Sequence, residues 1–257
     1  MKRLSVVMIV LFLVFGFSTG AFADQGLDRI KSSGVLKVGS TATGIPTTFM
    51  DKQSGKIVGI MVDVSEEVAK YLGVKLEVVE TAWSSLIPSL QTQKIDMLAA
   101  AMIITPQRQE VVDFSVPVYP YCEALVVKDS DTKPYASLDE LTGLKLGAQV
   151  GTFYIKSLEE RGFKNVAVYD NAGDILTEIS NGRIDGGVID GPIAKWLAKN
   201  NPQFKIRVVN TYKPVLCGDI GIGVNKENKD LLQQVNAAVE KMKKEGKVEQ
   251  ILQKWGQ

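Results

Sequence analysis

Residues 95–108, I-D-M-L-A-A-A-M-I-I-T-P-Q-R, lead from a buried strand directly into the start of a helix. The run from Ile95 to Met102 is almost entirely apolar, which is typical of a strand covered on both faces. Thr105 and Pro106 then indicate a helix start, because a hydroxyl caps free N–H groups and proline suits the first turn. Arg108 follows in that turn, where a cation opposes the helix dipole. Its position raises the question of which anion it faces.

Strands and helices alternate on both sides of this stretch. Apolar periodicity predicts strands at 35–40, 75–79, 144–150, 166–169, 184–189, 205–209 and 220–224. It predicts helices at 57–72, 83–93, 153–161 and 173–181, one that opens at residues 190–192, and two more at 227–245 and 247–255. This alternation favours an α/β fold of parallel sheets with right-handed crossovers.

The opening stretch has a counterpart later in the chain. Residues 86–96 have the pattern of a helix that ends in a basic residue, Ile and Asp before an apolar strand, and residues 175–185 have the same layout. Each strand runs into a helix start, at Thr105 and at Asp190. The similarity predicts two lobes of similar build, with helix N-termini at the carboxyl ends of their sheets, where open α/β sheets bind ligands.

The N-terminus has the pattern of a secretory signal peptide. A basic start at Lys2 and Arg3 precedes an apolar run, and 21–23 (A-F-A) is a cleavage signal. The run is too short to span a membrane, no other run of about 18 apolar residues follows, and no cysteine near the cleavage site would carry a lipid anchor. We expect cleavage after Ala23 and a mature, soluble chain of residues 24–257 in the periplasm.

Composition excludes several classes of function. Removal of Lys2 and Arg3 from the 30 basic residues leaves 28 against 29 acidic residues, so the mature chain lacks the electrostatic footprint of a nucleic-acid-binding protein. The chain has no histidine, which removes the commonest general base and the commonest zinc ligand. We expect no cofactor and no metal site.

Two charged side chains at the predicted sheet edges are candidates for function. Arg108 at a helix N-terminus suits a planar carboxylate or phosphate. The alternative is an exposed arginine paired with Glu110 or Asp113. Asp190 suits a ligand ammonium, or it only caps the helix that begins at Gly191. The two roles of Asp190 can coexist, because a carboxylate has several lone pairs.

Seven stretches resemble the periplasmic solute-binding proteins of ABC importers, in the polar amino-acid branch. They are G-V-L-K-V-G (34–39), W-S-S-L-I-P-S-L-Q (83–91), K-I-D-M-L (94–98), M-I-I-T-P-Q-R (102–108), V-V-D-F-S-V-P-V-Y (111–119), N-G-R-I-D (181–185) and G-K-V-E-Q-I-L-Q-K-W-G (246–256). The resemblance implies an α/β, two-lobed periplasmic-binding-protein-like fold (type II), each lobe a mostly parallel sheet flanked by helices, with two hinge strands. It implies lobe 1 from 24–118 and 221–257, and lobe 2, including the hinge strands, from 119–220.

The resemblance also implies roles for residues in the cleft between the lobes. Arg108 is similar to the arginine that holds the ligand α-carboxylate, and Asp190 to the aspartate that receives the α-ammonium. Trp83 is similar to the aromatic that covers the ligand, although an interface or core aromatic is the alternative. Ala101 matches a position that offers its backbone carbonyl to the ammonium. Thr152 lies in a strand-to-helix turn with exposed N–H groups.

Several positions depart from the family pattern. Thr41 replaces an acidic residue that often meets a basic side chain, and Gly44 replaces an aromatic one. Ile103 lacks the usual hydroxyl but keeps its N–H, and Phe153 stands where Thr or Gly is common. Gln149 falls at a position that often lines the side-chain pocket.

These departures predict a pocket with one cation, one anion and otherwise apolar or aromatic walls. A charged ligand side chain would be unpaired there, which is costly. We expect a zwitterion with a neutral side chain, apolar, weakly polar or aromatic. An atypical carboxylate ligand is the alternative.

Cys122 and Cys217 are the two cysteines of the chain. An oxidising compartment permits a disulfide between them, and two buried free thiols are the alternative. The resemblance places them at the lobe-2 ends of antiparallel hinge strands, where they would meet.

The resemblance implies a monomeric binding protein, not an enzyme, that closes on its ligand and delivers it to the membrane permease of an ABC importer. One alternative is a cyclohexadienyl-dehydratase-like enzyme, which would need an acid or base in a cleft where only Asp190 is placed. Another is the sensor domain of a receptor, which would need a membrane span after the lobes.

Overall fold

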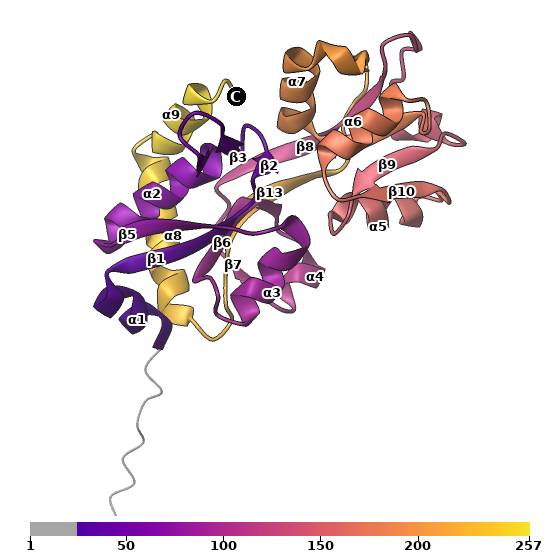
Figure 1. Cartoon of the computed structure of the whole chain (residues 1–257). Helices are drawn as coiled ribbons and strands as arrows, with labels where there is room; N and C mark the ends of the chain where they lie inside the picture. The colour runs from indigo at the N-terminus through magenta and orange to yellow at the C-terminus, as the bar shows by residue number, and fades with distance from the viewer. Residues whose placement is uncertain (1–24) are drawn as a thin grey trace, which may run out of the picture.

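The computed structural model describes residues 25–257, which form two lobes lying side by side (Figure 1). Both the first part of the described chain and its C-terminal helices belong to one lobe, and the middle of the chain forms the other. The predicted signal peptide lies outside the described residues. Within 25–257, no helix combines the length and apolar character needed to cross a membrane. The predicted two-lobed α/β fold is confirmed.

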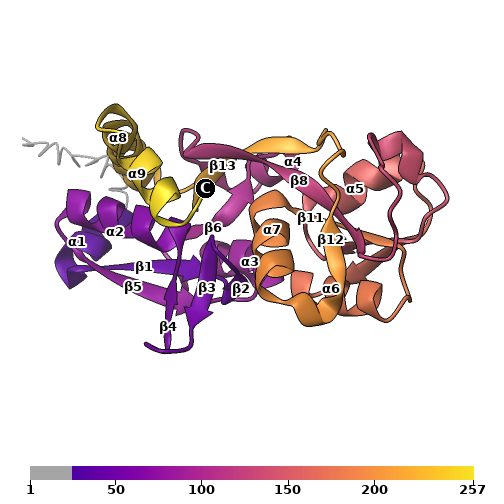
Figure 2. The same cartoon turned by 90° about the horizontal axis from the view of Figure 1, so that it is seen from above.

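Lobe 1 is built on strands in the order β5-β1-β6-β13. β1, β5 and β6 are parallel, and β13 is antiparallel to β6. The strands are β1 (Val35–Ser40), β5 (Lys75–Glu80), β6 (Met97–Ile103), β7 (Asp113–Phe114) and β13 (Cys217–Val224). The helices are α1 (Gln25–Ser33), α2 (Ile60–Leu72), η1 (Trp83–Ser85), α3 (Leu86–Gln91), α4 (Pro106–Gln109), α8 (Lys229–Lys244) and α9 (Lys247–Lys254). A small antiparallel sheet of β2 (Thr43–Gly44), β3 (Thr48–Asp51) and β4 (Lys56–Val58) lies between β1 and α2 in the chain (Figure 2).

Lobe 2 repeats this arrangement in the order β10-β9-β11-β8. β9, β10 and β11 are parallel, and β8 is antiparallel to β11. The strands are β8 (Tyr119–Lys128), β9 (Leu146–Gln149), β10 (Val166–Tyr169), β11 (Gly186–Asp190) and β12 (Ile206–Val208), which pairs with β8. The helices are η2 (Leu138–Leu141), α5 (Phe153–Glu160), α6 (Ala172–Ser180), α7 (Gly191–Asn200) and η3 (Pro202–Phe204).

Two strands, β8 and β13, pass from one lobe to the other. They pair antiparallel from Tyr119 opposite Ile220 to Cys122 opposite Cys217. A disulfide joins Cys122 to Cys217, which are 95 residues apart in sequence. The lobe boundaries expected at 118/119 and 220/221 fall at the lobe-1 end of this paired segment and stay a prediction.

Strand β6 is buried on both faces, as its composition predicts. Met97, Ala99 and Ala101 belong to a core that includes residues of α2, α8 and α9, whereas Leu98 and Ala100 belong to a second core with α3. Lobe 2 has the same layering, because one core lies against α5 and another against α6 and α7. Each lobe is therefore a sheet enclosed by helices on both sides.

The helix predicted at 57–72 begins three residues later than expected. Ile57 and Val58 are the end of β4, and α2 starts at Ile60. Gly59 separates the two elements with φ 135°, and a Cβ added there would lie 2.4 Å from the carbonyl oxygen of Thr47. Only glycine fits this position, and its backbone ends the strand before the helix begins.

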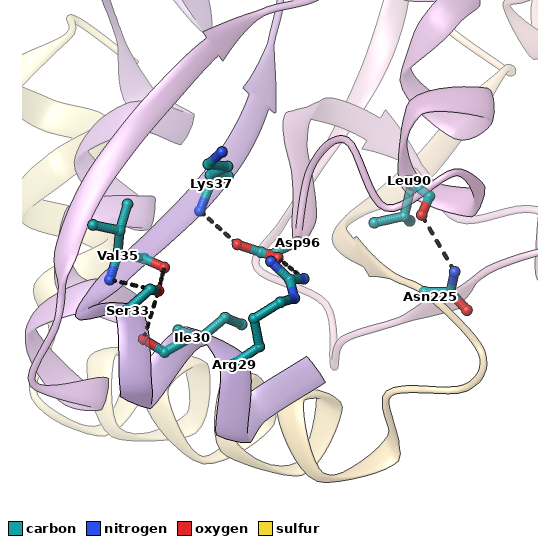
Figure 3. A network of polar contacts seen from close by, with 8 residues as sticks. All are labelled: Arg29, Ile30, Ser33, Val35, Lys37, Leu90, Asp96 and Asn225. Carbon is teal, nitrogen blue, oxygen red and sulfur yellow. Dashed lines mark hydrogen bonds and ion pairs between the residues drawn. The ribbon is translucent and has the colours of Figure 1, made fainter. Parts of the chain in front are cut away.

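Asp96 connects three elements of lobe 1 at the start of β6. Its side chain is 1% exposed, and its carboxylate accepts hydrogen bonds from the Lys37 backbone N–H, at 2.8 Å, and from the guanidinium of Arg29 on α1 (Figure 3). In the same view the Asn225 amide donates to the Leu90 carbonyl oxygen at 3.2 Å and ties the end of β13 to α3. These contacts fix β6, whose carboxyl end leads to the cleft.

Candidate functional site between the lobes

Helix α4 begins at the carboxyl end of β6 with the predicted cap. The Thr105 hydroxyl accepts a hydrogen bond from the Arg108 N–H at 3.3 Å, and Pro106 lies in the first turn. This geometry sets Arg108 at the edge of the cleft, on the lobe-1 side.

The Arg108 guanidinium bridges the two lobes. Its Nη1 donates to the Ile103 carbonyl oxygen at 2.5 Å, and its Nη2 donates to the Gly151 carbonyl oxygen of lobe 2 at 2.9 Å. Its central carbon lies 5.6 Å from the centre of the Trp83 ring, a cation–π distance. Burial lowers the pKa of Arg108 and the charge of Asp190 raises it, but a guanidinium stays charged at neutral pH.

The alternative pairing of Arg108 with a neighbouring carboxylate is not what the structure shows. Within the described residues Asp113 forms its ion pairs with Lys226 and Lys229, and no ion pair joins Arg108 to Glu110. The guanidinium is directed to backbone carbonyls at the cleft.

Asp190 stands across the cleft at the start of α7. It occupies the N-cap position, but its side chain makes no capping hydrogen bond. Its carboxylate instead accepts a hydrogen bond from the Tyr154 hydroxyl at 2.6 Å and another from Tyr121. Burial raises the pKa of Asp190, whereas these two hydrogen bonds and the charge of Arg108 lower it. The carboxylate is thus oriented toward the cleft rather than toward the helix N–H groups.

A small cavity lies between these charges. Nine residues line it: Trp83, Ala101, Ile103, Arg108, Tyr121, Thr152, Phe153, Tyr154 and Asp190. Its volume of about 10 Å³ is about the room that one water molecule needs. The cavity in this arrangement of the lobes is therefore too small for an organic ligand.

Seven of the ten residues predicted for the site belong to this lining, and three do not. The Thr41 side chain is buried and shares a hydrogen bond of 2.7 Å with the Thr48 hydroxyl. Gly44 lies in β2. The Gln149 amide donates to the Asp170 carbonyl oxygen at 3.0 Å, at the end of β9.

Two lining residues, Tyr121 and Tyr154, were not predicted from the sequence. Tyr121 lies on the crossing strand β8, and Tyr154 lies in the first turn of α5. In the sequence they have the pattern of core aromatics, and both are indeed buried. Their hydroxyl groups distinguish them, because a buried tyrosine hydroxyl requires a polar partner.

The backbone of β6 is irregular where it meets the cavity. Ala101 has φ 54°, in the left-handed region that disfavours residues with a Cβ. The pairing with β13 also shifts, since Gly221 lies opposite Met102 but Gly223 lies opposite Leu98. This bulge releases backbone groups near Ala101 from the regular ladder beside the cavity.

Within residues 25–257, no three Cys, Asp or Glu side chains are grouped closely enough to hold a metal ion. The site consists of one guanidinium, one carboxylate, the hydroxyl groups of two tyrosines and of Thr152, and otherwise apolar or aromatic walls.

Two α/β lobes, two crossing strands and a charged cleft between the lobes define the class of two-lobed binding proteins with the type II periplasmic-binding-protein fold. The chain belongs to the bacterial extracellular solute-binding proteins, family 3, whose sequence profile matches residues 36–257.

Three similar proteins illustrate the range of this family. The L-cystine-binding protein TcyJ of Escherichia coli strain K12 is 31% identical over 246 residues, which cover 95% of this chain and 91% of that protein. The structure of an ancestral arginine-binding protein bound to glutamine is 37% identical with a TM-score of 0.78, covering 87% of this chain and 98% of that one. The structure of the ancestral amino acid-binding protein AncCDT-1, a precursor of cyclohexadienyl dehydratase, is 33% identical with a TM-score of 0.81, covering 90% and 99%.

Proposed function

We propose that this protein binds a free amino acid with a neutral side chain between its lobes and delivers it to the membrane permease of an ABC importer. One observation carries the proposal. Arg108 of lobe 1 and Asp190 of lobe 2 face one cavity, and every other residue of its lining is uncharged at neutral pH. Opposite charges on opposite lobes match the carboxylate and the ammonium of an amino acid, so the ligand would hold the lobes together.

The contacts of Arg108 support a carboxylate ligand. In the structure a neutral carbonyl, that of Gly151, accepts from Nη2 at 2.9 Å. A ligand carboxylate would take over this donor and form a charge-assisted hydrogen bond, which is roughly twice as strong as a neutral one. Exchange of the Gly151 carbonyl for the ligand would thus favour the bound state.

The lining supports a neutral ligand side chain. A lysine or arginine ligand would need a second carboxylate, and Asp190 is the only one in the lining. Thr41 occupies a position where relatives often carry an acidic residue. Its hydroxyl shares a hydrogen bond with Thr48, and it lies outside the lining. A charged ligand side chain would be left unpaired among Trp83, Ile103 and Phe153.

Calorimetry on the refolded protein tests this proposal. After unfolding and refolding to remove any carried ligand, each common amino acid is titrated in turn, and saturable heat is expected with one or more neutral amino acids. Arg108→Ala should weaken binding about 100-fold, because the charge-assisted hydrogen bonds to the carboxylate are lost.

The matched control for Arg108→Ala is Arg183→Ala. Arg183 is an exposed lobe-2 arginine paired with Glu178, so its removal should leave the affinity unchanged. Binding heat only with lysine and arginine would overturn the proposal that the ligand has a neutral side chain. Absence of heat with every amino acid would overturn the amino-acid ligand.

We infer that the chain binds without catalysis. Asp190 is the only carboxylate in the lining and is held by two tyrosine hydroxyls, so a binding role already accounts for its contacts. Mass spectrometry after prolonged incubation should recover the bound amino acid unchanged. Conversion of the ligand would support the dehydratase-like alternative.

We also infer a monomer that acts in the periplasm after removal of residues 1–23. The disulfide between Cys122 and Cys217 suits an oxidising compartment. Intact-mass measurement of the protein recovered from cells, with light scattering for its oligomeric state, tests both points.

A further inference from the structure

Tyr119 carries a buried hydroxyl that has no hydrogen-bond partner among the residues of the described range. Its side chain is 7% exposed and projects from the crossing strand β8, opposite Ile220 of β13. Removing a hydroxyl from water without a partner is costly, and such groups are rare in folded proteins. This one therefore calls for an explanation.

The ring of Tyr119 packs against Tyr121, a residue of the cavity lining to which Tyr119 itself does not belong. Tyr119 and Tyr121 are two residues apart on β8, so their side chains leave the same face of the strand. Their rings are stacked, with centroids 6.3 Å apart and planes at 24°. Tyr121 lines the cavity, and Ala101 and Ile103 of the lining belong to the same core cluster as Tyr119.

The hydroxyl of Tyr119 stays protonated in this place. Burial raises the pKa of Tyr119 well above its ordinary value, and the nearby charge of Asp190 raises it further. A neutral tyrosine hydroxyl donates one hydrogen bond, so the group needs an acceptor.

The hydroxyl groups of the lining already have partners. The Thr152 hydroxyl donates to the Gln149 carbonyl oxygen at 2.7 Å, and Tyr154 and Tyr121 both donate to Asp190. Under the proposed function, Arg108 is occupied by the ligand carboxylate. Two side-chain donors then remain for the rest of the ligand, the indole N–H of Trp83 in the lining and the hydroxyl of Tyr119, and of these the Tyr119 hydroxyl is the one that is buried without a partner.

We propose that Tyr119 determines specificity by donating a hydrogen bond to the ligand side chain once the lobes enclose it. The ligand class narrows to amino acids whose neutral side chain carries an acceptor, a hydroxyl or a carboxamide. This inference rests on the proposed function. A ligand with a purely apolar side chain would leave the hydroxyl unpartnered, and the site would discriminate against it by about tenfold or more.

Matched ligand pairs test the inference, because threonine and valine, or glutamine and methionine, differ mainly in the polar group. Calorimetry on the refolded wild-type protein should show at least a tenfold preference for the polar member of one pair. Tyr119→Phe should abolish that preference by weakening the polar ligand and leaving the apolar one unchanged. The melting temperature of Tyr119→Phe should stay level or rise, since an unpartnered hydroxyl is removed.

Tyr212→Phe is the control, because the Tyr212 hydroxyl donates to the buried Glu123 at 2.8 Å and its ring belongs to a lobe-2 core cluster that does not contain Tyr119 or Tyr121. It should lower the melting temperature without changing the preference between paired ligands. A preference that survives Tyr119→Phe, or equal weakening of both ligands, would overturn the role of Tyr119 and leave the proposed function standing. Binding of apolar amino acids alone by the wild-type protein would do the same, whereas no binding of any amino acid would overturn both.

Discussion

The two lobes share a hydrogen-bonded loop in front of one central strand, but the surroundings of this loop differ between them. Just before β6, Asp96 accepts a hydrogen bond from the Lys37 N–H at 2.8 Å, and just before β11, Asp185 accepts one from the Lys145 N–H at 2.7 Å. Each aspartate N–H donates back to the carbonyl oxygen of the same lysine, at 2.8 and 2.9 Å. The sequence similarity between 86–96 and 175–185 thus corresponds to the same loop closure in both lobes.

The glycines beside these loops correspond as well. A Cβ added to Gly39 of β1 would lie 2.5 Å from the Ile95 side chain, and one added to Gly147 of β9 would lie 2.7 Å from Ile184. Each isoleucine directly precedes its aspartate. Both lobes therefore need a residue without a side chain where the loop packs onto the sheet.

The surroundings of the aspartates differ. Asp96 is buried and also binds Arg29 of α1, whereas Asp185 is exposed. Helix α1, which precedes the first strand of lobe 1, carries the arginine that contacts Asp96. Both lobes therefore need the hydrogen-bonded loop before the strand, but only lobe 1 also buries the aspartate of that loop.

The largest expected effect comes from the disulfide, which acts on one lobe only. The 95-residue separation between Cys122 and Cys217 encloses almost all of lobe 2, so in the chain-entropy description the bridge constrains that lobe when unfolded. The double variant Cys122→Ala/Cys217→Ala should lose about 4 kcal/mol of unfolding free energy. Hydrogen exchange followed by mass spectrometry should show the loss of protection in lobe 2.

Lobe 1 is the internal control for this experiment. Peptides of α2 and α8 should keep their protection in the double variant, because their residues lie outside the closed loop. Equal loss in both lobes would show that the bridge stabilises the protein through the crossing strands rather than through lobe 2.

A second prediction sharpens the comparison of the aspartates. Asp96→Ala should lower the unfolding free energy by about 3 kcal/mol, because a buried carboxylate with a charged partner and a backbone partner is lost. Asp185→Ala should cost about 1 kcal/mol, because water can replace an exposed acceptor. Urea denaturation of both variants measures the difference.

The contribution of the ion pair between Asp96 and Arg29 can be measured separately. In a double-mutant cycle, Asp96→Ala should cost less in an Arg29→Ala background than in the wild type. Suppose that Asp96→Ala and Asp185→Ala lower the unfolding free energy equally. The stability of the loop before each strand would then depend on the hydrogen bonds from the lysine N–H groups and not on burial by α1.

Much of this fold was predictable from local pattern. The strand predicted at 35–40 is found there as β1, and apolar 95–102 is found as β6 at Met97–Ile103. The small sheet β2-β3-β4 was not predicted, since its strands are two to four residues long and lack a clear alternation. Short strands depend on neighbours that are distant in sequence.

The candidate site was predictable to the extent that its residues lie at strand-to-helix turns. Arg108 and Thr152 come shortly after the ends of β6 and β9, and Asp190 is the last residue of β11, so topology alone brings them to the carboxyl edges of the sheets. Tyr121 and Tyr154 were not predictable in the same way. Their contacts with Asp190 depend on how β8 and α5 pack in lobe 2, which the period of apolar residues does not specify.

The smallest expected effect concerns the strands that lead to the site, β6 and β11. β6 reaches the cavity through Ala101 with φ 54°, whereas no residue of β11 has a positive φ. Ala101→Gly should relieve roughly 1 kcal/mol of backbone strain, offset by the greater chain entropy that glycine loses on folding. Ala99→Gly, in the same strand without a positive φ, should be destabilising by about 1 kcal/mol. The melting temperatures of the two variants, measured by thermal denaturation, should therefore differ by several degrees. Equal melting temperatures would mean that the left-handed backbone at Ala101 stores no strain. In that case β6 would differ from β11 in backbone conformation but not in strain.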